Sequence, residues 1–65
     1  MKLRKMELPE IQIVQKEMLN KKISLQLIAT NNGLPLSRVR GLLLRKQTAT
    51  QDKIDSIIRY VTEYE

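Results

Sequence analysis

Gly33 stands between two short segments of helical spacing, and this glycine constrains the fold more than any other residue. Before it, Leu25, Ile28 and Ala29 recur at the three- and four-residue steps of a helix about two turns long. After it, the helical spacing of apolar residues resumes within residues 35–44. Glycine has no Cβ, so it tolerates the left-handed backbone that ends a helix in a sharp turn. The sequence therefore predicts two short helices that meet at a tight corner.

Two further segments of helical spacing flank this corner. The first begins near Leu8, with Pro9 in a first-turn position that tolerates proline, and ends at residues 20–22. The second begins at Thr48 or Thr50, and a start at Thr48 has the spacing of a capping box. No segment alternates with period two for long enough to compete as a strand, so a compact all-α fold of four helices, or five, is expected. The inward positions of the two flanking helices are expected to be Leu8, Ile11, Val14, Met18, Leu19, Ile54, Ile57, Ile58 and Val61.

The composition of the 65-residue chain excludes several classes of protein. Cys and His are absent, which removes disulfide scaffolds, zinc fingers, thiol nucleophiles and histidine catalysis. The chain has no run of about 18 apolar residues, the length that spans a bilayer. We expect a protein that is not an enzyme and that binds no cofactor, metal or small-molecule ligand. Residues 1–65 are expected to form one domain in which residues 1–6 are flexible. A core without Phe or Trp is only marginally stable at this length, so a second copy of the chain would add useful burial.

The corner meets each packing demand of two short helices joined by a tight turn. Two crossing helices need a small residue where their backbones approach, and Ala29 supplies it. Leu34 is the apolar plug expected directly after the turn, and Val39 and Leu42 bury one side of the second helix. Short helices joined by a few residues that include Gly are the helix-turn-helix signature, which here covers residues 25–44.

The run ATNNGL at residues 29–34, followed by Ser37-Arg38-Val39-Arg40, resembles the λ repressor/Cro-type helix-turn-helix and also the lac-repressor-type headpiece. The resembling motif covers about 20 of the 65 residues, with a helix before it and another after it as in the phage-repressor family. The resemblance implies a cytoplasmic transcriptional regulator of phage or plasmid type, which represses by binding a palindromic operator as a homodimer. Pro35 departs from the Ser or Thr that usually caps the second helix, and the region after the motif is too short to carry over a dimer surface.

The positive charge lies on the part of the chain that contains the corner. Residues 1–46 hold ten Lys or Arg against three Glu, a net charge of +7, whereas residues 47–65 have a net charge of −2. A cationic surface of this kind neutralises phosphates and gives an affinity that falls steeply with salt. The charge distribution therefore indicates double-stranded DNA as a partner, independently of the resemblance.

Docking of the helix at residues 35–44 into the major groove assigns roles to its exposed side chains. Arg40 is predicted to pair with guanine and Leu36 to touch a thymine methyl, with Ser37 in the same exposed turn. Gly41 is predicted to let the helix approach the DNA closely. Contacts to the DNA backbone are predicted for Ser24 and Gln26, which start a helix, and for Arg38, Arg45 and Lys46.

Two other functions remain open from the sequence alone. The same helical corner occurs in protein-interaction modules, such as an anti-repressor or an adaptor, that bind no specific DNA. A basic amphipathic helix on a membrane surface is a third interpretation, against which the helix caps and the Gly33 turn argue. Two of the predicted base contacts also have interpretations without DNA: Leu36 is typical of a residue that packs against a turn, and Arg40 of a solvated surface arginine.

Overall fold

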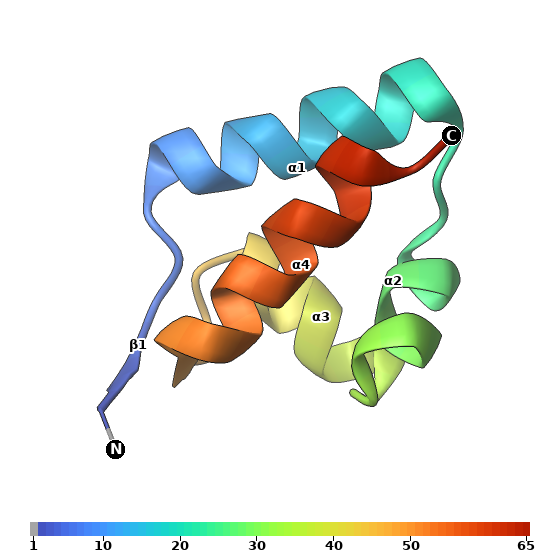
Figure 1. Cartoon of the computed structure of the whole chain (residues 1–65). Coiled ribbons are helices and arrows are strands. Elements are labelled where there is room, and N and C mark those ends of the chain that lie inside the picture. The colour runs from blue at the N-terminus through green and yellow to red at the C-terminus, as the bar shows by residue number, and fades with distance from the viewer. Residues whose placement is uncertain (1) are drawn as a thin grey trace.

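A computed structural model describes residues 2–65 as four helices and a two-stranded sheet (Figure 1). The helices are α1 (Leu8–Lys21), α2 (Leu25–Asn32), α3 (Leu36–Leu43) and α4 (Gln51–Glu63), and the strands are β1 (Leu3–Arg4) and β2 (Ala49–Thr50). The prediction of four helices is confirmed, and the small sheet is an element that the all-α prediction lacked. None of these helices is long and apolar enough to cross a membrane.

Hydroxyl side chains mark the starts of α2 and α4. Ser24 is the N-cap of α2, and its Oγ accepts a hydrogen bond from the Leu27 amide at 3.1 Å. Thr50 does the same for α4, where its Oγ1 accepts from the Lys53 amide at 3.3 Å. Of the two predicted starts of the last helix, the one at Thr50 is confirmed. The start at Thr48 is wrong, because the chain stays extended through β2.

The N-terminal residues that the structure describes pack as part of the fold, although residues 1–6 were expected to be flexible. β1 pairs antiparallel with β2, with Leu3 opposite Thr50. Met6 follows β1 and is fully buried. Met1 lies outside the described residues. A strand of two residues is too short to show an alternating pattern, so the periodicity of the sequence does not predict it.

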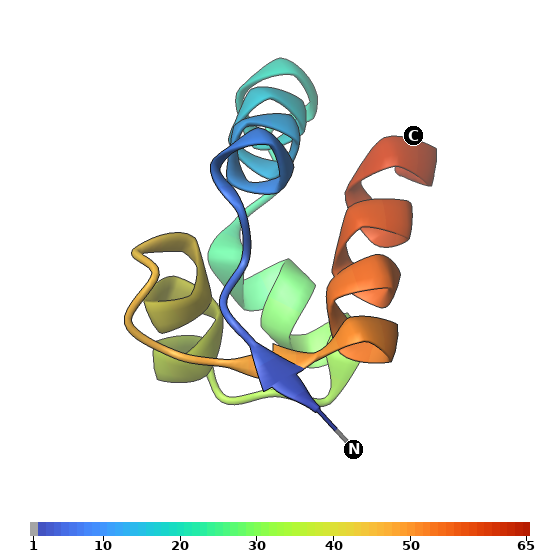
Figure 2. The same cartoon turned by 90° about the vertical axis from the view of Figure 1, so that its left-hand side faces the viewer.

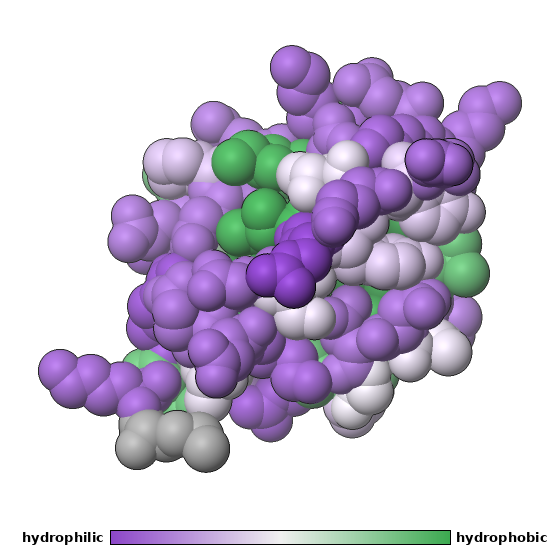
Figure 3. Space-filling model, in the orientation of Figure 1, coloured by the Kyte–Doolittle hydropathy of each residue, from purple (hydrophilic) through white to green (hydrophobic). Residues whose placement is uncertain are grey.

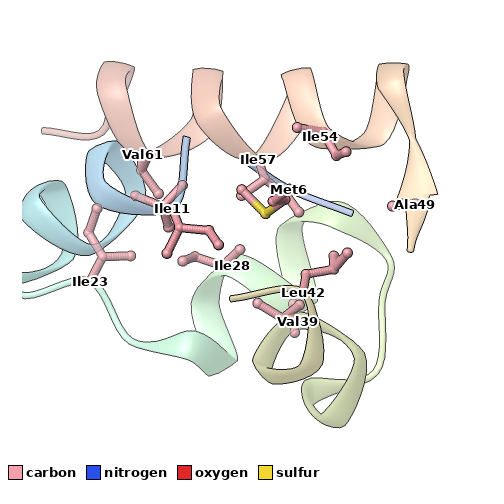
Figure 4. Close-up of a cluster of buried hydrophobic side chains, with 12 residues drawn as sticks. Met6, Ile11, Ile23, Ile28, Val39, Leu42, Ala49, Ile54, Ile57 and Val61 are labelled. Carbon is pink, nitrogen blue, oxygen red and sulfur yellow. The ribbon is translucent and has the colours of Figure 1, made fainter. Parts of the chain in front are cut away.

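The core is a single aliphatic cluster to which all four helices contribute (Figure 4). α1 and α4 lie side by side, and α2 and α3 close the opposite side of the cluster (Figures 1 and 2). The face formed by α1 and α4 is largely hydrophilic, with a few apolar patches between the hydrophilic side chains (Figure 3). Burial stabilises by about 1.5–3 kcal/mol for each large aliphatic side chain, so this cluster supplies most of the driving force for folding. Its members are Met6, Ile11, Val14, Ile23, Ile28, Ala29, Val39, Leu42, Ala49, Ile54, Ile57 and Val61.

Two leucines predicted to face inward from α1 are exposed. Leu8 has 58% of its surface exposed and Leu19 has 82%, whereas Ile11 and Val14 are buried and Met18 packs against the core. With 3.6 residues per turn, Leu8 and Leu19 fall on one flank of the buried face and not on the face itself. The prediction that these two side chains enter the core is therefore wrong.

Asn32 is the one buried polar side chain among residues 2–65, and it joins α2 to α4. Its Nδ2 donates to the Ile28 carbonyl at 2.8 Å, and its Oδ1 accepts from the Ser56 hydroxyl at 2.6 Å. The Lys53 ammonium donates to the Asn32 carbonyl at 2.7 Å, which places a cation at the negative end of α2. Hydrogen bonds therefore hold the end of α2 against α4, in addition to apolar packing.

Arg4 fastens the N-terminal segment to both α1 and α4. Its guanidinium donates to the two carboxylate oxygens of Glu10 at 2.8 and 2.7 Å, and its Nε donates to Gln51 Oε1 at 2.7 Å. The hydrogen bonds from Arg4 lower the pKa of Glu10 below its ordinary value of 4.5, although partial burial acts in the opposite direction.

We expect Asn32→Ala to lower the free energy of unfolding by about 1–3 kcal/mol, because it removes a buried side chain that donates one hydrogen bond and accepts another. A urea titration measures the loss. Asn20→Ala, at an exposed position of α1, is the matched control and should change stability by no more than about 0.5 kcal/mol. Equal losses in the two variants would contradict the anchoring role of Asn32.

The Arg4–Glu10 pair should make part of the stability depend on pH. Because the pKa of Glu10 is lower in the folded state, the stabilisation is fully present above the ordinary pKa of 4.5 and is lost as the pH falls through the folded-state value. Melting temperatures measured from neutral to acidic pH should therefore fall less steeply for Glu10→Gln than for the native chain. Glu65→Gln serves as the control for removing a carboxylate. The same acid slope in Glu10→Gln and the native chain would refute the role of the pair.

Candidate nucleic-acid interface

α2 and α3 meet at the tight corner that the sequence predicts (Figure 2). Gly33 has the left-handed conformation, with φ +64° and ψ +34°, and the Leu34 amide donates to the Ala29 carbonyl at 2.9 Å. Ala29 is buried in the core, as expected of a small residue at a close helix crossing. No atom lies within 4 Å of a Cβ built on Gly33, so the glycine is needed for its backbone conformation and not for space.

The exposed face of α3 carries three of the side chains predicted to contact bases. Leu36 has 37% of its surface exposed, and Ser37 and Arg40 are also exposed. Leu36 and Ser37 lie one helical turn before Arg40, so the three side chains share a face. Val39 and Leu42 point the other way and are buried in the core, as predicted. This division gives α3 one face for the core and one for a ligand.

Gly41 does not belong to that exposed face, so the prediction that it lets α3 approach DNA is wrong. It is buried, and a Cβ at this position would lie 2.3 Å from Cγ of Gln47. The Gly41 carbonyl also accepts hydrogen bonds from the Lys46 and Gln47 amides, at 2.8 and 3.2 Å. The glycine makes room for the loop that follows α3.

Arg38, predicted to contact the DNA backbone, holds the same loop. Its Nη2 donates to the Thr48 carbonyl at 3.0 Å, and the side chain is half-buried. A guanidinium has five N–H donors, so this bond leaves others for a phosphate. In the free protein the role of Arg38 is to tie α3 to the residues that lead into β2.

Arg45 and Lys46 are exposed in the loop after α3. Arg45 has a φ of +59°, a left-handed conformation that costs a residue with a Cβ about 1–2 kcal/mol. Within residues 2–65, neither side chain forms an ion pair. Both cations are therefore available to an anionic ligand.

Ser24 and Gln26 use part of their hydrogen-bonding capacity within α2. Besides the capping bond to Ser24, the Gln26 Nε2 donates to Thr30 Oγ1 at 3.1 Å. Both residues are exposed, the serine hydroxyl retains its donor, and the glutamine retains a second N–H. Their position at the start of α2 is compatible with the predicted contacts to phosphate, which stay predictions.

The chain has a long stretch without carboxylates that coincides with this corner. Residues 18–51 contain six Lys or Arg and no Asp or Glu, and they include the end of α1, all of α2 and α3 and the loop to α4. Lys22, which is not among the residues predicted to contact DNA, belongs to this run. Lys22 is exposed, has a φ of +56° and lies two residues before the N-cap of α2. An anion that approaches the corner therefore meets no carboxylate from this stretch.

We expect Gly41→Ala to destabilise the protein by about 1–3 kcal/mol through overpacking, although alanine favours an unhindered helix position. The physical reason is the clash with Gln47, because both Cγ and Cβ of that residue lie close to the added methyl group. Gln47→Ala removes the nearer atom and should restore part of the stability in the double variant. A stabilising Gly41→Ala, measured by urea unfolding, would show that the contact is not tight.

No protein-family model, curated protein or solved structure matches this chain. Its function is therefore inferred from the geometry and the charge of the α2–α3 corner.

Proposed function

We propose that the protein is a sequence-specific regulator of transcription that binds double-stranded DNA, with a λ repressor/Cro-like helix-turn-helix formed by α2 and α3. The observation that carries the proposal is the exposed face of α3, which holds Leu36, Ser37 and Arg40 within a stretch free of carboxylates. α3 enters the major groove while α2 lies across the backbone. As a homodimer on a palindromic operator, the protein represses by excluding polymerase. It has no enzymatic activity and needs no cofactor.

Arg40 is the principal base-reading residue of this proposal. It is exposed, lies one turn from the start of α3, and forms no ion pair within residues 2–65. Its guanidinium is suited to pair with both O6 and N7 of guanine, which discriminates against a wrong base by about 1–3 kcal/mol. Leu36 supplies an apolar contact to a thymine methyl, and the hydroxyl of Ser37 both donates and accepts.

Phosphates bind on both sides of the base-reading turn. Ser24 and Gln26 present donors at the start of α2, and Arg45 and Lys46 supply charge after α3. Arg38 adds the guanidinium donors that its bond to the Thr48 carbonyl leaves free. Each phosphate that is neutralised releases condensed counterions, so the affinity for any duplex falls with rising salt.

Selection of bound duplexes from randomised DNA at about 0.1 M salt tests the proposal. We expect enrichment of a palindromic sequence whose half-sites are separated by about 10 base pairs or a multiple of that spacing. Recovery of no preferred sequence would contradict the proposal. A binding constant that does not change with salt would instead favour a protein-interaction module.

The double variant Ser37→Ala, Arg40→Ala should lose the preference for the selected sequence but keep its background affinity for other DNA. We expect a loss of about 10–100-fold on the selected duplex and little change on an unrelated one, measured by fluorescence anisotropy. Arg59→Ala removes an exposed arginine from α4 and is the matched control, which should bind both duplexes nearly as the native chain does. Equal losses on the two duplexes would show that Ser37 and Arg40 do not read bases.

A further inference from the structure

α1 carries an uncharged stripe on its exposed side. Its members are Leu8, Gln12, Gln15 and Leu19, all of which are exposed, the two leucines by 58% and 82%. They recur at steps of four, three and four residues, so they line up along one flank of the helix over about 16 Å. A stripe of this kind has the geometry of a helix-packing surface.

A projecting side chain and a hollow adjoin each other at one end of this stripe. Leu19 is the most exposed large apolar side chain among residues 2–65. The hollow next to it has a volume of about 390 Å³ and is lined by Gln15, Met18, Leu19 and Ile23. An apolar hollow beside an exposed leucine gives a second copy of the chain a place to pack an apolar side chain from the other end of its own stripe.

The stripe also reads the same in both directions, Leu–Gln–Gln–Leu, and is symmetric about the point between Gln12 and Gln15. We propose that two copies of the chain associate through this stripe, with their α1 helices antiparallel about a two-fold axis. The axis sets Leu8 against Leu19 of the second copy and Gln12 against Gln15 of the second copy. Each glutamine amide both donates and accepts, so the two central pairs satisfy one another.

Charge favours the antiparallel orientation of a second copy. Glu7 precedes the first turn of α1 and Lys22 follows its last turn, and both are exposed. Antiparallel helices bring Glu7 of each copy near Lys22 of the other and oppose the two helix dipoles, whereas parallel helices would bring like dipole ends together. Because the stripe itself is uncharged, the net charge of +5 does not fall on the contact.

The orientation also fits DNA binding, and this part of the inference rests on the proposed function. The stripe lies about a quarter-turn around α1 from the buried side chains Ile11 and Val14. The two-fold axis therefore runs roughly from α1 toward α2 and α3, which occupy the opposite side of the domain in Figures 1 and 2. Both copies then present α3 on the same side, as a palindromic operator requires.

Self-association is measured without DNA, so its failure and the failure of DNA binding are separate results. In sedimentation equilibrium from about 10 to 500 µM protein, we expect a monomer–dimer equilibrium for the native chain and an association constant at least about tenfold lower for Leu19→Glu. Ile13→Glu changes another apolar residue of α1, 43% exposed and outside the stripe, and should associate like the native chain. A native chain that stays monomeric throughout, or equal weakening by the two variants, overturns the proposal.

Single cysteines report the arrangement of the two copies even if Leu19→Glu fails to fold, because the native chain has no Cys. When Leu8→Cys and Leu19→Cys are mixed in equal amounts, with one of them labelled with ¹⁵N, mass spectrometry distinguishes mixed from self-linked dimers. We expect the mixed disulfide to dominate, since only the unlike positions face each other across the axis. Disulfides that form faster within either variant alone overturn the antiparallel arrangement.

Discussion

The left-handed turn at Gly33 sets the angle between α2 and α3, and the exposed face of α3 depends on it. The hydrogen bond from the Leu34 amide to the Ala29 carbonyl closes the turn. The hydrogen bonds of Asn32, which directly precedes Gly33, hold the end of α2 to α4. A few polar contacts and the backbone conformation of Gly33 thus position the corner, while packing of the aliphatic core holds the helices together. In a domain of 65 residues with marginal apolar burial, such contacts decide which surface is presented to a ligand.

Local signals predicted the helices well, and contacts between distant residues escaped prediction. The N-cap at Ser24 and the turn at Gly33 each depend on residues within a few positions, so the spacing of the sequence revealed them. The pairing of Leu3 with Thr50 joins segments far apart in the chain, and no local pattern records it. The exposure of Leu19 was not predicted, because a spacing of three or four residues does not distinguish the buried face of a helix from the flank of that face.

The candidate site was predicted in part for the same reason. The burial of Val39 follows from helical periodicity, and it leaves Arg40 on the exposed side of α3. The sequence does not tell whether a glycine in a helix faces a ligand or a neighbouring loop, and Gly41 faces Gln47. The sequence also does not tell whether an arginine is free to bind a ligand. Arg38 donates to the Thr48 carbonyl, and this bond depends on the path of the loop after α3.

The central claim is that the exposed turn of α3 contacts the edges of DNA bases. Titration of ¹⁵N-labelled protein with a selected duplex, followed by amide chemical shifts, locates the contact directly. Contact through α3 predicts the largest shifts at residues 36–40, smaller ones at residues 24–26, and little change along the outer face of α4. Large shifts on α4 with α3 unchanged would contradict it.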